Sequence, residues 1–418
     1  MKKISITGTK GKTTVTRVLS GVIHALGQNT LRVDTDGHYI NEQQMSTLED
    51  SKALFSLVPT VCPGKYLIEM KEFFPNFVAI LEAALGSSSA AGLGYGSHDI
   101  GIFLNVFEDH MGVTDRLKSR RDLAKAKNFI FSRIADDGFA IFNADDGHVC
   151  SQLKMLPYGR AVNLIPVGKK FNHFDIATHL EKGGFCITHE NKDIILRSKE
   201  KNEVLLSIDR IPWTFEGNYI PSIWNLMFVV AALYAFGDCK FTDEVRETLE
   251  RYRLDVEGGR LTMLKNDNNV KILVDYAHEK YSLVEIAKFA KKLGKRTIGV
   301  IRLAPDRTNQ MISDTGKAVA NKFTDIIVYD KIDGVKKMSY QGKKQKIVRS
   351  VGEVSEILHG SITKFKKKGK AERIIVEEEA IKKASEIVNK GDVVVVICGD
   401  DHKETIASIK KYFNAYFE

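Results

Sequence analysis

One stretch decides the fold of this 418-residue chain: Gly8-Thr9-Lys10-Gly11-Lys12-Thr13-Thr14. An apolar run at residues 3–7 precedes it, and residues 14–26 follow it with apolar side chains at helical spacing. A glycine-rich loop between a buried strand and a helix presents backbone N–H groups and the positive helix end to an anion. Lys12 is placed to reach the β and γ phosphates of a nucleotide, and the Thr13 hydroxyl to bind Mg²⁺. The sequence therefore predicts a phosphate-binding loop within one βα unit of a parallel sheet.

Residues 1–256 are expected to form one α/β domain around this loop. Apolar runs typical of buried strands lie at Val78 to Leu81, Ile100 to Val106 and Phe139 to Asn143, and a helical pattern covers Arg120 to Ile134. Residues 160–215 differ, because their short alternating segments are typical of antiparallel strands. We predict a P-loop ATPase domain with a mostly parallel sheet and a small antiparallel β subdomain, followed by a helix at Ser222 to Phe236.

Residues 257–418 are predicted to form a smaller second domain. A glycine-containing linker at 255–259 marks the boundary. Strands and helices alternate along it, as is typical of a Rossmann-like α/β domain. The predicted strands are Lys271 to Asp275, Arg296 to Ile301, Asp325 to Tyr329 and Asp392 to Cys398, and the predicted helices are Tyr281 to Leu293, Ser313 to Lys322 and Glu377 to Asn389.

Composition narrows the class of protein. The chain is 43% hydrophobic with a net charge of +9, and its lysines are spread out with few aromatic residues among them. This pattern favours small anionic substrates over a nucleic-acid partner. The five cysteines have neither zinc nor redox spacing, and no apolar run has the length of a signal peptide or membrane helix. We expect a cytoplasmic enzyme with no membrane partner, and the sequence leaves a homo-oligomer open.

Further blocks carry a resemblance to a known family. The loop resembles that of the Mur ligase superfamily, and the segment Asp34-Thr35-Asp36-Gly37-His38-Tyr39-Ile40 resembles a block of the C-terminal module of cyanophycin synthetases. The other blocks keep the order of the superfamily; they are Glu82 with its flanking alanines, Asn105-Val106-Phe107-Glu108-Asp109-His110, Ala126-Lys127, Asn143-Ala144-Asp145-Asp146, Gly259-Arg260, Asp275-Tyr276-Ala277-His278, Asp306-Arg307 and Asp330. The resemblance covers nearly the whole chain.

The resemblance implies that ATP and Mg²⁺ are the cofactors. It places three groups of residues at the site. The nucleotide ligands are Gly8, Thr9, Lys10, Gly11, Lys12, Thr13, Thr14, Asn225, Arg260 and Asp275; the metal ligands are Thr13, Glu82 and His110; and Thr35, Asp36, His278, Asp306 and Arg307 face the substrates. Lys12, His110 and Lys127 are the implied catalytic residues, and Lys127 aligns with a lysine that many Mur ligases carry carbamoylated.

Plainer alternatives stay open for several of these residues. Glu82 and Lys127 are also compatible with solvated surface side chains, His110 with a structural histidine, and Asp275 with a helix N-cap. The superfamily's His-Asn pair before the adenine-contacting asparagine is replaced here by Pro221-Ser222. Adenine stacking would then fall to another side chain, such as Tyr219 or Trp224.

The expected reaction is ATP-dependent amide formation between an amino acid and a carboxylate of an amino acid or peptide, through an acyl phosphate. The chain begins close to the loop, so we expect a free-standing module without the UDP-binding or ATP-grasp domains of its relatives. The segment after Glu82 lacks the arginine and paired glycines common in cyanophycin synthetases, so their arginine specificity is not carried over. Two alternatives remain: a cell-wall-type peptide ligase, and a degenerate ATP-binding regulatory subunit.

Overall fold

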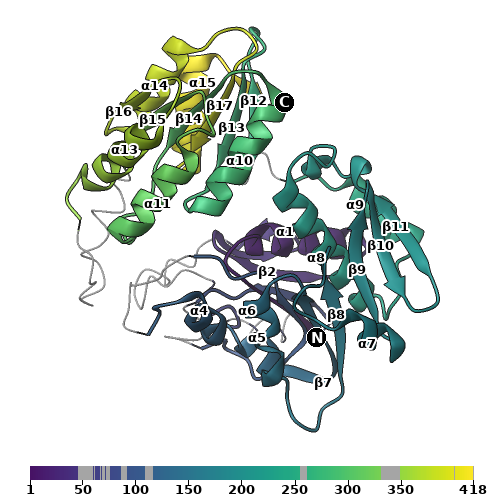
Figure 1. Ribbon diagram of the computed structural model, residues 1–418. Coiled ribbons are helices and arrows are strands. Elements are labelled where there is room, and N and C mark those ends of the chain that lie inside the picture. Colours follow the sequence, from purple (N-terminus) through teal and green to yellow (C-terminus); the bar gives the residue numbers. More distant parts are fainter. Residues whose placement is uncertain are drawn as a thin grey trace. The chain divides into compact units, whose positions relative to one another are not determined.

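The computed structural model describes residues 1–45, 60, 62–65, 67, 71, 76–85, 92–108, 116–254, 261–330, 349–399 and 401–417. The chain divides into two compact units (Figure 1). The N-terminal unit holds Met1–Phe107 and Arg120–Leu254, and the C-terminal unit holds Glu108–Ser119 and Asp255–Glu418. None of the helices in the described parts of the chain combines the length and the apolar character needed to span a bilayer.

The N-terminal unit is built on one sheet of eleven strands, in the order β11-β10-β9-β8-β7-β6-β1-β5-β2-β3-β4. The central strands from β2 to β9 are parallel, whereas β3, β4, β10 and β11 run antiparallel to their neighbours. The strands are β1 Lys2–Thr7, β2 Thr30–Asp34, β3 Gly37–Ile40, β4 Gln43–Gln44, β5 Val78–Glu82, β6 His98–Phe103, β7 Ile134–Asn143, β8 Val162–Val167, β9 Phe185–Glu190, β10 Asp193–Ser198 and β11 Asn202–Ser207.

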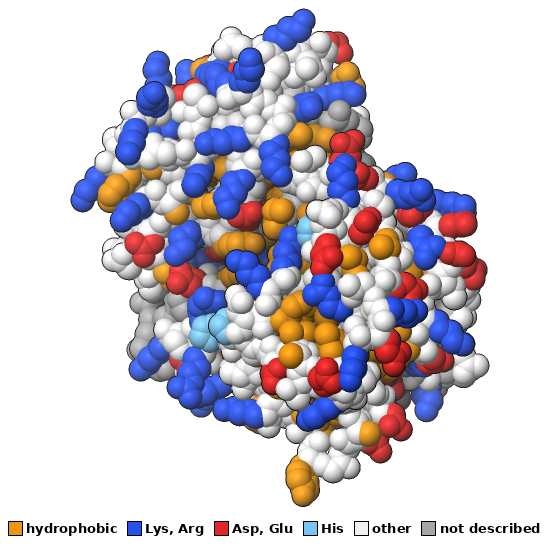
Figure 2. Space-filling view, turned by 45° about the vertical axis from the view of Figure 1, so that its right-hand side comes forward, with side chains coloured by type: hydrophobic (Ala, Val, Ile, Leu, Met, Phe, Trp, Pro, Cys, Tyr) orange, Lys and Arg blue, Asp and Glu red, His pale blue; other side chains and the backbone are white. Residues whose placement is uncertain are grey.

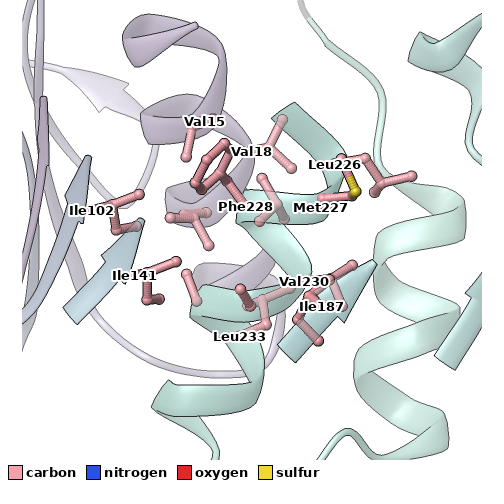
Figure 3. Close-up of a cluster of buried hydrophobic side chains, with 14 of the residues drawn as sticks. Val15, Val18, Ile102, Ile141, Ile187, Leu226, Met227, Phe228, Val230 and Leu233 are labelled. Carbon is pink, nitrogen blue, oxygen red and sulfur yellow. The ribbon is translucent and has the colours of Figure 1, made fainter. Parts of the chain in front are cut away.

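Two helices cover one face of this sheet and form its core (Figure 3). Helix α1 (Lys12–Ala25) contributes Val15 and Val18, and α8 (Ile220–Phe236) contributes Phe228 and Val230, which pack on strand residues such as Ile102. Because α1 begins directly after the phosphate loop, this core fixes the position of the loop. The remaining helices of the unit are α4 Arg120–Ala126, α5 Phe129–Ser132, α6 Gly147–Cys150, α7 Ile176–Glu181 and α9 Asp243–Arg251.

The predicted α/β architecture is confirmed, with corrections in detail. The helix predicted from Arg120 to Ile134 is interrupted: α4 ends at Ala126, α5 is a single turn, and Ile134 already pairs with His98 as the first residue of β7. The strand predicted to reach Val106 ends at Phe103, which frees Asn105 for other contacts. The antiparallel strands are present, and β9 hydrogen-bonds to β8, so they continue the large sheet.

The C-terminal unit has a seven-stranded sheet in the order β16-β15-β14-β17-β13-β12-β18, parallel from β16 to β13. Its strands are β12 Thr262–Lys265, β13 Lys271–Asp275, β14 Thr297–Ile301, β15 Asp325–Val328, β16 Ala371–Arg373, β17 Val393–Ile397 and β18 Tyr416–Phe417. Its helices are α10 Lys280–Leu293, α11 Asn309–Val319, α13 Glu353–Phe365, α14 Glu377–Ile387 and α15 His402–Phe413. The predicted second Rossmann-like domain is therefore present.

Charge is distributed unevenly between these two parts of the chain. The excess of basic over acidic side chains, +9 in all, falls entirely within residues 255–418. Figure 2 shows Lys and Arg dominating the upper part of the view, while Asp and Glu are interspersed with them below. The basic character noted in the sequence is thus a property of the C-terminal unit and not of the domain that holds the phosphate loop.

Candidate active site

The phosphate loop joins β1 to α1 at the carboxyl edge of the large sheet. Strands β6, β1, β5 and β2 are neighbours, so the residues that follow them meet at one edge. Open α/β sheets bind ligands at this edge. The first N–H groups of α1 have no partner within the helix, and they face the same edge as the loop.

Two glycines allow the loop its close contacts. Gly8 has φ 154° and Gly11 has φ 85°. A Cβ at Gly8 would lie 2.9 Å from the Leu104 Cβ, and one at Gly11 would lie 2.3 Å from Asn225 Oδ1. Asn225, the residue predicted to contact adenine, therefore has its side chain directly against the loop. Only a residue without a side chain fits at Gly11 beside it.

Asn105 braces the loop from the neighbouring strand end. Its Oδ1 accepts from the N–H groups of Thr9 (3.2 Å) and Lys10 (2.9 Å), and its Nδ2 donates to the Lys10 carbonyl (3.1 Å). The Phe107 N–H donates to Thr9 Oγ1 at 3.0 Å. Asn105 was not among the site residues predicted from the sequence. Its place just after a strand that neighbours β1 was the signal that would have found it.

Lys12 lies over the loop, where its Nζ donates to the Thr9 carbonyl at 3.1 Å. The ammonium is thus held close to the N–H groups of the first turn of α1. Both kinds of group attract the same ligand, an anion.

Glu82, the last residue of β5, is 2% exposed. Its Oε1 accepts from Thr35 Oγ1 at 3.2 Å, and Thr35 Oγ1 lies 3.4 Å from Thr13 Oγ1. Within the described residues, its Oε2 is buried and has no hydrogen-bond partner. A buried carboxylate oxygen without a donor is costly unless a cation neutralises it. The solvated alternative for Glu82 is therefore wrong.

This set of oxygen atoms fits a divalent cation such as Mg²⁺. Across the part of the chain that the structure describes, no three His, Cys, Asp or Glu side chains converge on one point. Mg²⁺ is commonly held by one or two carboxylates together with substrate phosphates and water. The predicted ligand His110 and the predicted nucleotide contact Arg260 lie outside the described residues.

Lys127 is buried beside the loop. It is 4% exposed, and its Nζ lies 3.5 Å from Thr7 Oγ1, which in turn donates to the Ala83 carbonyl at 2.8 Å. Thr7 ends β1 and Ala83 follows Glu82, so Lys127 reaches under the two strand ends that carry the loop and the carboxylate. The alternative of a solvated helix lysine is wrong.

The adenine-stacking candidates differ in exposure. Tyr219, at the N-cap of α8, is 8% exposed, and Trp224 is half-buried against the core. Of the predicted substrate residues in this unit, Thr35 lies at the Glu82 end of the site. Asp36 forms an ion pair with Arg17.

Among the described residues of the C-terminal unit, Asp275 and His278 lie at the carboxyl end of β13, and Asp306 and Arg307 follow β14. Asp275 ends β13, and its Oδ2 accepts from the Leu261 N–H at 3.1 Å. The N-cap of α10 is Glu279, which accepts from Tyr281 and Ser282, so the N-cap alternative for Asp275 is wrong.

Two residues that were predicted to contact the substrates line the same pocket in the C-terminal unit. His278 and Arg307 line it together with Leu303, Met311 and Thr315. Asp306 Oδ1 holds Arg307 at 2.8 Å. Asp330, by contrast, accepts from the Gly352 N–H and anchors the start of α13.

Gly11→Ala is expected to weaken nucleotide binding by about tenfold, because the new Cβ displaces Asn225 and strains a left-handed residue. Titration with a fluorescent ATP analogue measures this. The control is Gly27→Ala, which also has positive φ (86°) but has nothing within 4 Å of its Cβ. Equal losses in the two variants would show that backbone strain alone is responsible, against the close contact with Asn225.

Comparison with known proteins gives the family. Residues 6–200 match the Mur ligase middle domain, and residues 259–399 match the Mur ligase glutamate ligase domain. A cyanophycin synthetase of Nostoc sp. is 28% identical over 398 residues, which are 94% of this chain but only 41% of that relative. The chain thus spans about two fifths of the length of that relative.

More distant matches agree. A UDP-N-acetylmuramoyl-L-alanyl-D-glutamate–2,6-diaminopimelate ligase of Cytophaga hutchinsonii is 23% identical over 98% of this chain and 74% of its own length. The structure of a bifunctional folylpolyglutamate synthase/dihydrofolate synthase, with Mn, AMPPNP and L-glutamate bound, has a TM-score of 0.65 at 16% identity. It matches 98% of this chain and 89% of that one. With both domains present in the family's order, this chain belongs to the Mur ligases.

Proposed function

We propose that this chain is an ATP- and Mg²⁺-dependent ligase that forms an amide between an amino acid and a carboxylate, through an acyl phosphate. The observation that carries the proposal is the buried Glu82, whose Oε2 has no hydrogen-bond partner among the described residues, beside Thr13 of the phosphate loop. A carboxylate of this kind is costly in a protein that binds no cation there.

The roles of the residues follow from their positions. Thr13 and Glu82 would hold Mg²⁺, with His110 as a further ligand. When bound, the metal supplies positive charge to the phosphate oxygens. Lys12 and the N–H groups of α1 stabilise the negative charge of the transferring phosphoryl group. Lys127, either as an ammonium or as a carbamate, supports the strand ends beneath.

Different residues would bind the nucleotide and the two substrates. Asn225 lies against the loop and is the proposed adenine contact. Arg260 and Asp275 are proposed as further nucleotide ligands. The pocket with His278 and Arg307, held by Asp306, is the proposed site for an amino-acid substrate. These proposed partners are small molecules, and we propose no nucleic-acid partner.

The proposed reaction has two steps, and the atoms balance in each. A carboxylate oxygen of the acceptor attacks the γ-phosphorus, and ADP leaves. The amine then attacks the carbonyl carbon, and phosphate leaves with that oxygen. The amine loses its proton in this second step, so the products are the amide, ADP and phosphate.

A labelled carboxylate tests this sequence. The enzyme is incubated with ATP, Mg²⁺ and a panel of amino acids and short acidic peptides carrying ¹⁸O in the carboxyl groups. We expect ADP and phosphate to form in step with an amide, and one ¹⁸O to appear in the phosphate, detected by mass spectrometry. AMP and pyrophosphate as products would contradict the acyl phosphate.

A second candidate is a peptide ligase of the cell-wall type. The match to a diaminopimelate ligase over 98% of this chain favours it. Peptide stems without a UDP group, included in the same panel, separate the two. The non-enzyme alternative, a degenerate ATP-binding subunit, predicts ATP binding without turnover on any acceptor.

A further inference from the structure

The turn between β2 and β3 brings Thr35 against the proposed metal site. The Thr35 hydroxyl lies 3.2 Å from Glu82 Oε1 and 3.4 Å from Thr13 Oγ1. A hydroxyl has one proton to donate, and a carboxylate can only accept, so Thr35 donates to Glu82. This bond occupies Oε1 and leaves Oε2 as the oxygen without a partner in the described residues.

A buried ion-pair network fixes both residues that flank Thr35. Asp34 is fully buried, and its Oδ2 accepts from Arg17 Nε (3.0 Å) and Arg32 Nη1 (2.7 Å). Its Oδ1 accepts from the Asp36 N–H at 2.9 Å, which closes the turn around Thr35. Arg17 also forms an ion pair with the Asp36 side chain.

Arg17 therefore binds the residues on both sides of Thr35. It is 7% exposed and belongs to α1, the helix that begins at Lys12. Burial works against its charge, but Asp34 and Asp36 outweigh burial and raise the pKa of Arg17 above its usual value. The guanidinium therefore stays charged at any working pH.

We propose that Arg17 is a positioning residue for the metal site, acting through Asp34 and Asp36 on Thr35 and thereby on Glu82. Arg17 forms ion pairs with Asp34 and Asp36, so its proposed effect on the metal site runs through these two residues. It ties the turn to the same helix that carries Thr13, so that the carboxylate and the loop hydroxyl keep a fixed separation. The inference rests on the proposed function, because it assumes that Glu82 and Thr13 hold Mg²⁺.

The same hairpin offers a matched control. Glu42, which follows β3, accepts from Ser20 Oγ of α1 at 2.5 Å and lies 3.5 Å from Arg32 Nη2. It is a second anchor of the hairpin on the same helix. It has no contact with Thr35 or Glu82 in the described structure. If Arg17 only stabilises the hairpin, substitution of Arg17 and substitution of Glu42 should have similar effects on metal binding. If Arg17 positions the metal site, only its substitution should weaken metal binding.

Metal binding is measured directly with Mn²⁺ and a non-hydrolysable ATP analogue, by the electron paramagnetic resonance signal of free Mn²⁺. Arg17→Met and Thr35→Val are each expected to weaken Mn²⁺ binding by about tenfold, as is usual when a residue supporting a metal ligand is lost. Thr35→Ser keeps the hydroxyl and is expected to stay within about twofold of the wild type. Glu42→Gln is expected to leave Mn²⁺ affinity unchanged, although its melting temperature falls.

Two outcomes separate the possible failures. If Arg17→Met binds Mn²⁺ as tightly as the wild type, or if Glu42→Gln weakens binding equally, the positioning role is wrong while the proposed function stands. If the wild-type protein shows no nucleotide-dependent Mn²⁺ binding, the proposed function itself fails.

Discussion

Lys12→Ala is expected to lower the rate of ADP formation by about a thousandfold, the upper range for loss of one group that stabilises transition-state charge. Among the described residues, the Lys12 ammonium donates to the Thr9 carbonyl of its own loop, at 3.1 Å. Its removal therefore leaves the core of α1 intact, and the melting temperature should stay close to that of the wild type. Single-turnover measurement of ADP and phosphate gives the rate of the chemical step.

Lys12→Arg is the informative companion variant. It keeps the positive charge but replaces a compact ammonium with a planar guanidinium of different reach. Recovery of most of the lost rate would show that charge near the phosphates is sufficient. A rate as low as that of Lys12→Ala would show that the position of the ammonium matters as well. A Lys12→Ala protein with more than about a tenth of the wild-type rate would contradict the role assigned to this lysine.

Local sequence patterns were enough to predict the loop and the elements around it. Gly8 and Gly11 mark left-handed or close-approach positions, and the apolar spacing of residues 15–23 marks the buried face of α1. The order of strands and helices was enough to predict two α/β domains, because each strand–helix pair forms a local unit. These features depend on residues that are close together in the sequence, so they can be predicted from the sequence.

Contacts between distant segments were not readable in this way. The buried Lys127 contacts Thr7, 120 residues away, and Asn105, which binds the loop, lies 95 residues after Lys10. The helix expected at Arg120 to Ile134 was wrong because Ile134 pairs with His98 in the sheet, which overrides the local helical pattern. A lysine or an asparagine has the same local signature whether a sheet edge buries it or water surrounds it.

Glu82→Gln separates a metal ligand from a structural carboxylate, because the two roles predict opposite changes in stability. Glutamine keeps the shape and an oxygen to accept from Thr35, now 3.2 Å from Oε1, but removes the negative charge. Burying a charge without a partner is unfavourable. In metal-free buffer the variant is therefore expected to have a higher melting temperature than the wild type. Functional groups often lower the stability of a protein, and removing one raises it. If Glu82 served only as a hydrogen-bond acceptor, the substitution would weaken its hydrogen bond with Thr35, and the melting temperature would fall.

The same variant should lose the function that the carboxylate supports. The Mg²⁺ concentration for half-maximal ADP formation is expected to rise by at least about tenfold, since one charged oxygen ligand is lost from the site. Glu42→Gln is again the matched control, because Glu42 pairs with Arg32 and Ser20 and has no hydrogen bond to Thr35 or Glu82 in the described structure. A higher melting temperature combined with a weaker response to Mg²⁺ is a pair of changes that a structural role for Glu82 does not produce. If Glu82→Gln instead melts lower and keeps the wild-type Mg²⁺ requirement, Thr13 and Glu82 do not form a metal site.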